Sequence, residues 1–159
     1  EKMGKLQMSG GIAAPNLLNI CVDAGTEGEI SGRVYSCYSR EPMVFGNVVQ
    51  LLRYMESFYN RIQFPEAAVL LRSFENVSQV RREAVPEQKV NREYIMAQKG
   101  TLASFCVYVQ YRQNATWQGI ICWEEQNRDV EFRSALEMIA LIDNALLLLK
   151  EKSAEQAGK

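Results

Sequence analysis

The chain contains no histidine among its 159 residues. Imidazole is the usual general base near neutral pH, the orienting member of hydrolase triads and the commonest zinc ligand. The absence of histidine therefore excludes Ser/His/Asp triads, Cys/His pairs and His-metal sites from this chain.

Cysteine is sparse, and its spacing fits neither metal nor redox chemistry. The four cysteines form no CxxC pair, which excludes a zinc ribbon and a thioredoxin-like site. All four are predicted to lie on strands, away from a helix N-terminus or a basic neighbour that would lower a thiol pKa. They are Cys21, Cys37, Cys106 and Cys122.

Other catalytic patterns are missing as well. The sequence has no GxGxxG or P-loop motif. Glu124-Glu125 and the pair Asp129 and Glu131 are predicted at a strand end and a turn, where water solvates the carboxylates and nothing separates their pKa values. We therefore expect a nonenzymatic protein with no catalytic residue, no metal site and no cofactor.

Long apolar runs and a strong charge of one sign are also absent. The longest run, Ala145 to Leu149, is far shorter than the roughly 20 residues of a membrane-spanning helix. Residues 1–5 contain no apolar segment of the kind found in secretory signals. We expect no membrane contact and a cytoplasmic location. The net charge of −1 lacks the positive field of a typical duplex-DNA binder.

The composition that remains, 47% hydrophobic and 23% charged, is that of one globular domain spanning 1–159. Within it, the sequence matches itself at an offset of 87 residues. Gly32 then falls on Gly119, and Phe45 falls on Phe132. The apolar pattern of strands and helices coincides at the same offset without a gap, which indicates an internal repeat.

A signal that does not depend on hydrophobicity repeats at the same offset. Ser134 and Glu137 have the spacing of a capping box, in which the hydroxyl accepts from a first-turn amide and the carboxylate reaches back to the cap amide. Asn47 and Gln50 lie 87 residues earlier and can make a weaker version of both bonds. Both repeats are therefore predicted to begin a helix at equivalent positions.

Each repeat is predicted to form three antiparallel strands followed by a helix. In the second copy, apolar residues alternate along 105–111 and 117–123, and a turn centred on Asn114 makes opposing residue numbers sum to 228. This register places Cys106 opposite Cys122 and Phe105 opposite Trp123. The remaining predicted strands cover 16–23, 30–37, 43–45 and 130–132, with a turn at 25–28, and the predicted helices cover 48–61 and 135–151.

The fold class is thus α+β, with internally duplicated βββα repeats, an antiparallel sheet and a helix packed behind each repeat. Repeat one covers 16–62 and repeat two covers 103–149. Between them, 63–102 is predicted to hold a short helix opened by Pro65 and then a solvated linker over 75–95. The tail, 152–159, is polar and is predicted to fray.

The second helix is apolar nearly all round its last turns. Leu146 to Leu149 are consecutive, so they cannot all face one sheet. We expect this C-terminal helix to pack also on the other repeat or on a second subunit or protein partner.

Aromatic, guanidinium and amide side chains gather on the hairpins. Such groups stack on unpaired bases and hydrogen-bond to them. The alternative interpretation is structural, since Tyr111 and Trp117 are placed to form a cross-strand aromatic pair that stabilises a hairpin. The candidate nucleic-acid-binding residues are Arg33, Tyr35, Tyr108, Gln110, Arg112, Trp117 and Gln118.

The order of elements resembles the Whirly and PUR groups of single-stranded nucleic-acid-binding proteins. The resemblance covers 16–62 and 103–149 and includes Val130 to Phe132 leading into Arg133-Ser134-Ala135-Leu136. It implies repeats built as a curved antiparallel sheet backed by a helix, and binding of single-stranded DNA or RNA. We therefore hypothesise a nonenzymatic module that binds single-stranded nucleic acid, with a protein-binding, self-associating adaptor as the alternative.

Overall fold

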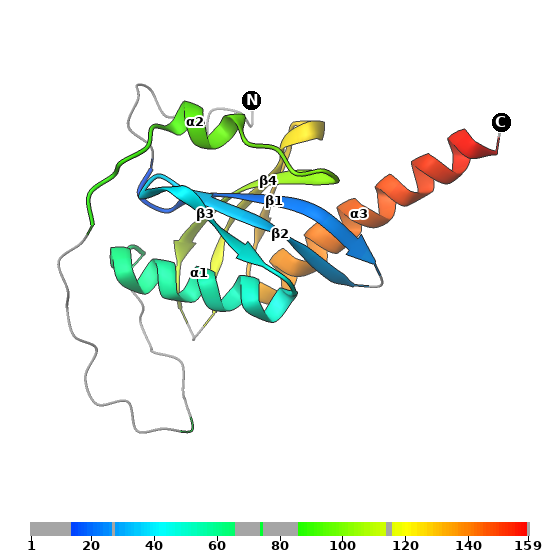
Figure 1. Ribbon diagram of the computed structural model, residues 1–159. Helices are drawn as coiled ribbons and strands as arrows, with labels where there is room; N and C mark the ends of the chain where they lie inside the picture. The colour runs from blue at the N-terminus through cyan, green and yellow to red at the C-terminus, as the bar shows by residue number, and fades with distance from the viewer. Residues whose placement is uncertain (1–13, 27, 66–73, 75–85, 114–115, 159) are drawn as a thin grey trace.

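The computed structural model describes residues 14–26, 28–65, 74, 86–113 and 116–158. Six strands form one antiparallel sheet in the order β3-β2-β1-β4-β5-β6 (Figure 1). With its helices the chain has an α+β fold, as predicted. The strands are β1 Leu17–Thr26, β2 Glu29–Ser36, β3 Ser39–Phe45, β4 Ala103–Tyr111, β5 Gln118–Trp123 and β6 Arg128–Phe132.

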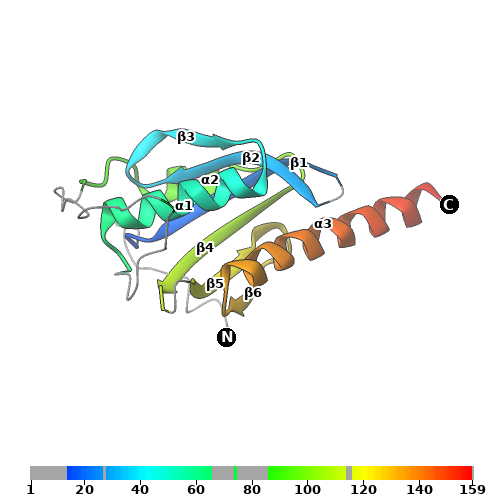
Figure 2. The ribbon, with the colours of Figure 1, turned by 90° about the horizontal axis from the view of Figure 1, so that it is seen from below.

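Two helices lie on one face of the sheet and a short helix lies on the other. Helices α1 (Val48–Ile62) and α3 (Ala135–Ala157) cover what we call the α1/α3 face, and α2 (Arg92–Ala97) covers the α2 face (Figures 1 and 2). A single turn of 3-10 helix, η2 (Glu124–Gln126), joins β5 to β6. The main core is the α1/α3 face, where alternate strand residues meet the buried side of each helix.

The predicted register of the β4–β5 hairpin is confirmed. Cys106 lies opposite Cys122, and Phe105 lies opposite Trp123. Asn114, on which the prediction was centred, is outside the described residues. Closer to the turn, the register shifts so that Tyr111 pairs with Gln118, which leaves one extra residue in β4.

Several irregular features recur 87 residues apart. The register of β1 and β2 shifts between Val22 and Ala24, and that of β4 and β5 shifts between Val109 and Tyr111. In the outer strand pairs, Gly32 lies opposite Phe45, and Gly119 lies opposite Phe132. These bulges and pairings do not follow from hydrophobic alternation, so their recurrence is independent of the apolar pattern.

The central pairing of β1 with β4 is symmetric about the pair Asn19 and Cys106. Leu17 lies opposite Tyr108, and Cys21 lies opposite Ser104. Ser104 lies 87 residues after Leu17, and Tyr108 lies 87 residues after Cys21, so a shift of 87 residues converts each pair into the other. The two halves of the sheet therefore meet in a register that a twofold rotation leaves unchanged.

Both long helices begin as the sequence predicts. The Asn47 side chain accepts a hydrogen bond from the Gln50 amide, and Ser134 Oγ accepts one from the Glu137 amide. The reciprocal bond differs from the prediction in one respect. The side chains of Gln50 and Glu137 accept from the amide of the residue before the cap rather than from the cap itself.

The connecting segment and the C-terminal tail differ from their predictions. The interpretation of 75–95 as a solvated linker is wrong for its last part, because α2 packs on the sheet with Val90 and Ile95 buried. The frayed tail is also wrong, since α3 continues to Ala157. Lys, Glu, Ala and Gln favour helix, and extending a helix avoids the cost of nucleation. The predicted helix after Pro65 falls largely on 66–73, outside the described residues.

We predict that Gly32→Ala and Gly119→Ala each lower the free energy of unfolding by about 2 to 4 kcal/mol. A Cβ atom at Gly32 would overlap the carbonyl oxygen of Cys21, and one at Gly119 would overlap that of Tyr108. Gly46→Ala is the matched control, because its Cβ would have 3.5 Å to the nearest atom. Urea unfolding measures all three, and a loss no larger than the control's contradicts the close strand approach.

Candidate functional site

Three of the predicted nucleic-acid-binding residues lie on the α2 face. Tyr35 and Tyr108 are buried there, and Arg33 is half-buried. Burial raises the pKa of Tyr108 to about 12. The two tyrosine rings are therefore covered by the chain itself and are not exposed for stacking on bases.

Arg33 is held by a network of protein groups. Its Nε and Nη2 atoms donate to the two carboxylate oxygens of Asp23 at 3.0 and 3.1 Å, and Nη1 donates to the Tyr35 hydroxyl at 2.6 Å. Nη2 also donates to the carbonyl of Lys99 at 2.8 Å. These bonds fix the segment that leads from α2 into β4 against the sheet. The Arg33 guanidinium is thus engaged in hydrogen bonds with other groups of the protein.

Arg112 and Trp117 lie on the opposite face of the sheet, against α1. The Arg112 guanidinium donates to the Pro65 carbonyl and Asn60 Oδ1, each at 2.7 Å, and lies 3.4 Å from Glu56 Oε1. Trp117 Nε1 donates to Glu56 Oε2 at 3.0 Å. Both side chains are buried. The end of the β4–β5 hairpin is in this way fastened to α1.

The aromatic pairing expected within this hairpin is wrong. Trp117 packs edge-on against Tyr59 of α1, with ring centroids 5.9 Å apart, instead of against Tyr111. Tyr111 lies opposite Gln118 and is exposed. The register shift after Val109 is the physical reason, because it removes Tyr111 from the position facing Trp117.

The last two predicted residues occupy the hairpin itself. Gln110 is exposed at the bulge, and Gln118 is half-buried and exchanges hydrogen bonds with the backbone of Gln113. The seven candidates therefore divide between two faces of the sheet. The structure does not bring them together on one open surface.

The cysteines lie in settings that suppress thiol reactivity. Burial raises the pKa of Cys21 and Cys106 to about 12 and that of Cys37 and Cys122 to about 11. Among the described residues the four thiols are free, and no group of three or more Cys, Asp and Glu is placed to hold a metal.

A buried carboxylate also lies on the α2 face. Glu124 is 6% exposed, accepts from Lys99 Nζ at 2.7 Å, and has its pKa raised by burial. Beside it, Glu125 Oε1 accepts from the Ser104 amide. Glu124 is bonded to a lysine side chain and Glu125 to a backbone amide, so the expectation that water solvates both carboxylates alike is wrong.

The exposed side of α3 carries large apolar residues. Leu136 is 79% exposed and Leu147 is 51% exposed. They are 11 residues apart, which is about three turns, so they lie on the same side of the helix with Ala140 between them. The C-terminal part of α3 also projects beyond the sheet (Figures 1 and 2). We call Leu136, Ala140, Asp143 and Leu147 the outer stripe of α3.

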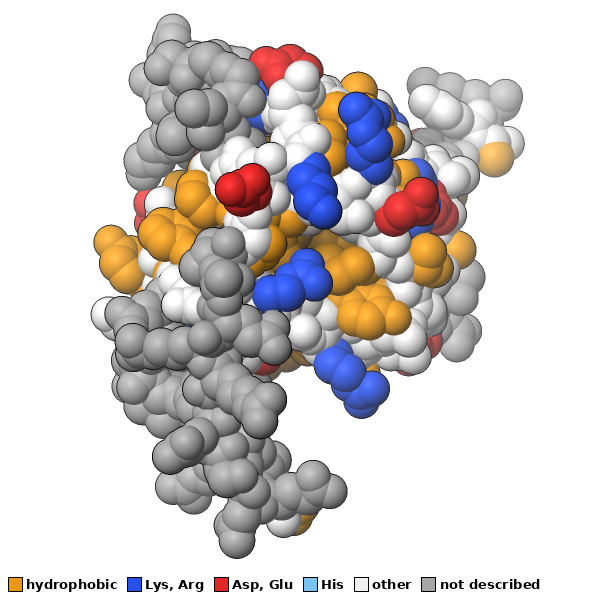
Figure 3. All heavy atoms as spheres, turned by 60° about the vertical axis from the view of Figure 1, so that its left-hand side comes forward, with side chains coloured by type: hydrophobic (Ala, Val, Ile, Leu, Met, Phe, Trp, Pro, Cys, Tyr) orange, Lys and Arg blue, Asp and Glu red, His pale blue; other side chains and the backbone are white. Residues whose placement is uncertain are grey.

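On the one face of the described residues that Figure 3 shows, charge does not mark a separate surface. Lys and Arg side chains are scattered there among acidic and apolar ones. No helix in the described part of the chain is both long and apolar enough to cross a membrane.

Comparisons with protein-family models, with curated proteins and with solved structures found no match for this chain.

The sequence indicated the outer stripe of α3 only in part. The run Leu146 to Leu149 indicated contacts on several sides of the helix, but Leu136 stands alone in the sequence and is recognised only once the helix is placed.

We predict that Glu56→Ala lowers the free energy of unfolding by about 2 to 3 kcal/mol. The substitution leaves the buried guanidinium of Arg112 without its carboxylate and the Trp117 indole without its acceptor. Ser57→Ala, on the exposed neighbouring residue, is the control. Urea unfolding monitored by tryptophan fluorescence measures both, and equal stabilities would contradict the fastening role of Glu56.

We predict that Asp23→Asn lowers the free energy of unfolding by about 1 kcal/mol near neutral pH. Hydrogen bonding from Arg33 holds the pKa of Asp23 below its ordinary value of 3.8. The stabilisation is therefore present above that value and is lost as the pH falls through the lower folded-state pKa. Urea titrations at stepwise lower pH should show the two proteins converging in acid, and a constant difference would contradict this assignment.

Proposed function

We propose that this protein is a nonenzymatic binding module that acts through protein–protein contact, and that its partner is a second copy of the same chain. The observation that carries the proposal is the outer stripe of α3, with Leu136 and Leu147 exposed on one side of a projecting helix. Apolar stripes of this kind are typical of helix pairing.

Charge along the helix favours a second copy over an unrelated partner. Asp143 lies within the outer stripe, and Lys150 follows two turns later. If two α3 helices pair antiparallel, Asp143 of each chain meets Lys150 of the partner subunit, and the two ion pairs flank the contact made by Leu147. The same surface is then complementary to itself, as a twofold interface requires.

The absence of histidine and the settings of the thiols support a nonenzymatic role. A thiol with a pKa of about 11 or 12 is almost entirely protonated at neutral pH and is a poor nucleophile. The four free thiols, three of them on buried residues, also fit the proposed cytoplasmic location, where thiols stay reduced.

Single-stranded nucleic acid has less support as a ligand. Arg33 and Arg112 donate to protein groups, and the rings of Tyr35, Tyr108 and Trp117 are buried. Of the proposed contacts, only Gln110 is freely exposed, at the bulge. Binding of a single strand would require these internal contacts to be broken.

We also propose that the two halves of the chain are copies of one βββα unit. The recurrence of the bulges, the Gly-to-Phe pairs and the helix caps at an offset of 87 residues supports it. The self-complementary pairing of β1 with β4 supports descent from a unit that once paired with itself.

We predict that the purified protein is a dimer and that Leu147→Asp makes it monomeric, because a buried unpaired carboxylate opposes association. Asp143→Lys should weaken the dimer by like-charge repulsion, and the swapped variant Asp143→Lys/Lys150→Asp should restore it. Light scattering after size-exclusion chromatography measures the mass, and circular dichroism confirms that each variant is folded. A monomeric wild-type protein would contradict the proposal.

The same preparation tests the nucleic-acid hypothesis. We expect a 260/280 nm absorbance ratio of protein alone and no binding to mixed-sequence single strands at low salt, where attraction to phosphate is strongest. Binding that falls steeply with salt would restore nucleic acid as the first function.

A further inference from the structure

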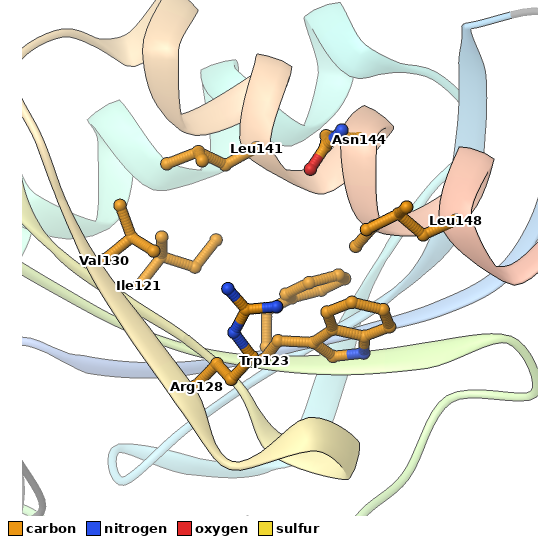
Figure 4. A pocket seen from close by; sticks show the side chains of 9 residues that line it. Ile121, Trp123, Arg128, Val130, Leu141, Asn144 and Leu148 are labelled. Atoms are coloured by element: carbon orange, nitrogen blue, oxygen red, sulfur yellow. The ribbon is translucent and has the colours of Figure 1, made fainter.

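A small apolar pocket lies between α3 and strands β5 and β6. Its volume is about 90 Å³. Figure 4 shows Ile121, Trp123 and Val130 on the sheet side, with Leu141, Asn144 and Leu148 on the helix above them. Phe105 and Ala145 complete the apolar wall.

The other half of the chain shows why this pocket exists. Ala145 corresponds to Phe58 at the offset of 87 residues, and Phe58 is 2% exposed and packs edge-on against Tyr38. Under α1 a phenyl ring thus occupies the helix position that carries only a methyl group under α3. On the sheet the size difference is reversed, because the pocket residue Trp123 corresponds to Ser36. In this half the large aromatic residue thus lies on the strand instead of on the helix.

Polar groups without partners surround the opening. Arg128 extends from β6 toward α3, and Asn144 faces it from the helix (Figure 4). Within the described part of the chain, neither side chain makes a hydrogen bond or an ion pair. Trp123 Nε1 is also buried and has no hydrogen-bond acceptor among the described residues, but it lies on the edge of the indole away from α3 (Figure 4). The pocket thus combines an apolar interior with unused donors, one of them cationic.

We propose that this pocket binds a small monocarboxylate whose body is a compact apolar group, such as a single aromatic ring or a branched alkyl chain. The apolar body replaces water against Phe105, Trp123 and Leu148, and the carboxylate accepts from the Arg128 guanidinium and the Asn144 amide at the opening. Ligand pockets commonly have this division between apolar walls and a few polar groups that set orientation.

Size and charge exclude other classes of ligand. The pocket, at about 90 Å³, is smaller than the enclosed cavity of about 150 Å³ that holds benzene. A single ring or a short branched chain would therefore lie partly in the opening, and a larger body is excluded. A cationic ligand would be repelled by Arg128, and a fully polar one would leave the apolar walls without contacts. The inference is independent of the outer stripe of α3, which lies on a different side of the helix.

The experiment follows the two tryptophan indole N–H signals of the full-length, 15N-labelled chain by NMR. Trp117 donates to Glu56 on the other side of the core and acts as an internal reference. Titration with 3-phenylpropionate or 4-methylpentanoate should shift the Trp123 signal in a saturable way and leave the Trp117 signal unchanged. The neutral amide, 3-phenylpropionamide, should bind at least about tenfold more weakly than the acid.

Two variants test the pocket and its cation separately. Ala145→Phe introduces the residue that the other half carries and should abolish the shift while keeping the thermal unfolding transition. Arg128→Gln, on an exposed side chain, should weaken the acid about tenfold and leave the amide unchanged. Absence of a saturable Trp123 shift, binding to Ala145→Phe as to the wild type, or equal affinity for acid and amide in the wild type would each overturn the proposal. If Ala145→Phe does not fold, Arg128→Gln and the amide decide the result.

Discussion

The pairing of β1 with β4 is the interaction on which the rest of the structure depends. It joins two three-stranded halves into one sheet, in a register centred on Asn19 and Cys106. Because this register is symmetric, each half is placed so that its hairpin reaches the helix of the other half. Without the central pairing, α1 would lose its contact with the β4–β5 hairpin, and α3 would lose its contact with the β1–β2 hairpin.

The contact of the β4–β5 hairpin with α1 differs from the contact of the β1–β2 hairpin with α3. On one side, Trp117 and Arg112 fasten the β4–β5 hairpin to α1 through Tyr59 and Glu56. On the other side, Gly25 of the β1–β2 hairpin lies against Leu146 of α3, with a Cβ at that glycine only 2.9 Å from the leucine side chain. The bulky Trp117 side chain therefore packs against α1, whereas Gly25 lets α3 lie close to its hairpin. Farther from the hairpin, the small side chain of Ala145 leaves a pocket under α3.

The α2 face explains why the pattern of Arg and Tyr residues resembled a ligand surface. Arg33, Tyr35 and Tyr108 have the side chains that bind bases, but the same chemistry serves to anchor a segment of the chain. Asn19 Nδ2 donates to the carbonyls of Ile95 and Gln98 at 2.7 and 2.8 Å, and Asp23 accepts from Thr101 and Arg33. A polar residue on the second face of a strand can contact solvent, a ligand or another part of the chain. Helix α2 is too short to be predicted from its hydrophobic periodicity.

The sequence by itself determined the strands, the two long helices, their caps and the register of the β4–β5 hairpin. These features follow from local rules, since alternation has a period of two, helices have a period of 3.6, and a one-residue slip would expose Phe105 and Val107. Only the tertiary structure decided which Arg and Tyr side chains are buried, where α2 packs and which helix residues stay exposed. Those outcomes depend on contacts between segments 50 to 90 residues apart, such as Trp117 with Glu56 and Asn19 with Gln98, and on the space left by Ala145. No local pattern encodes such contacts, because each residue's neighbours across the core are set only when the two halves meet.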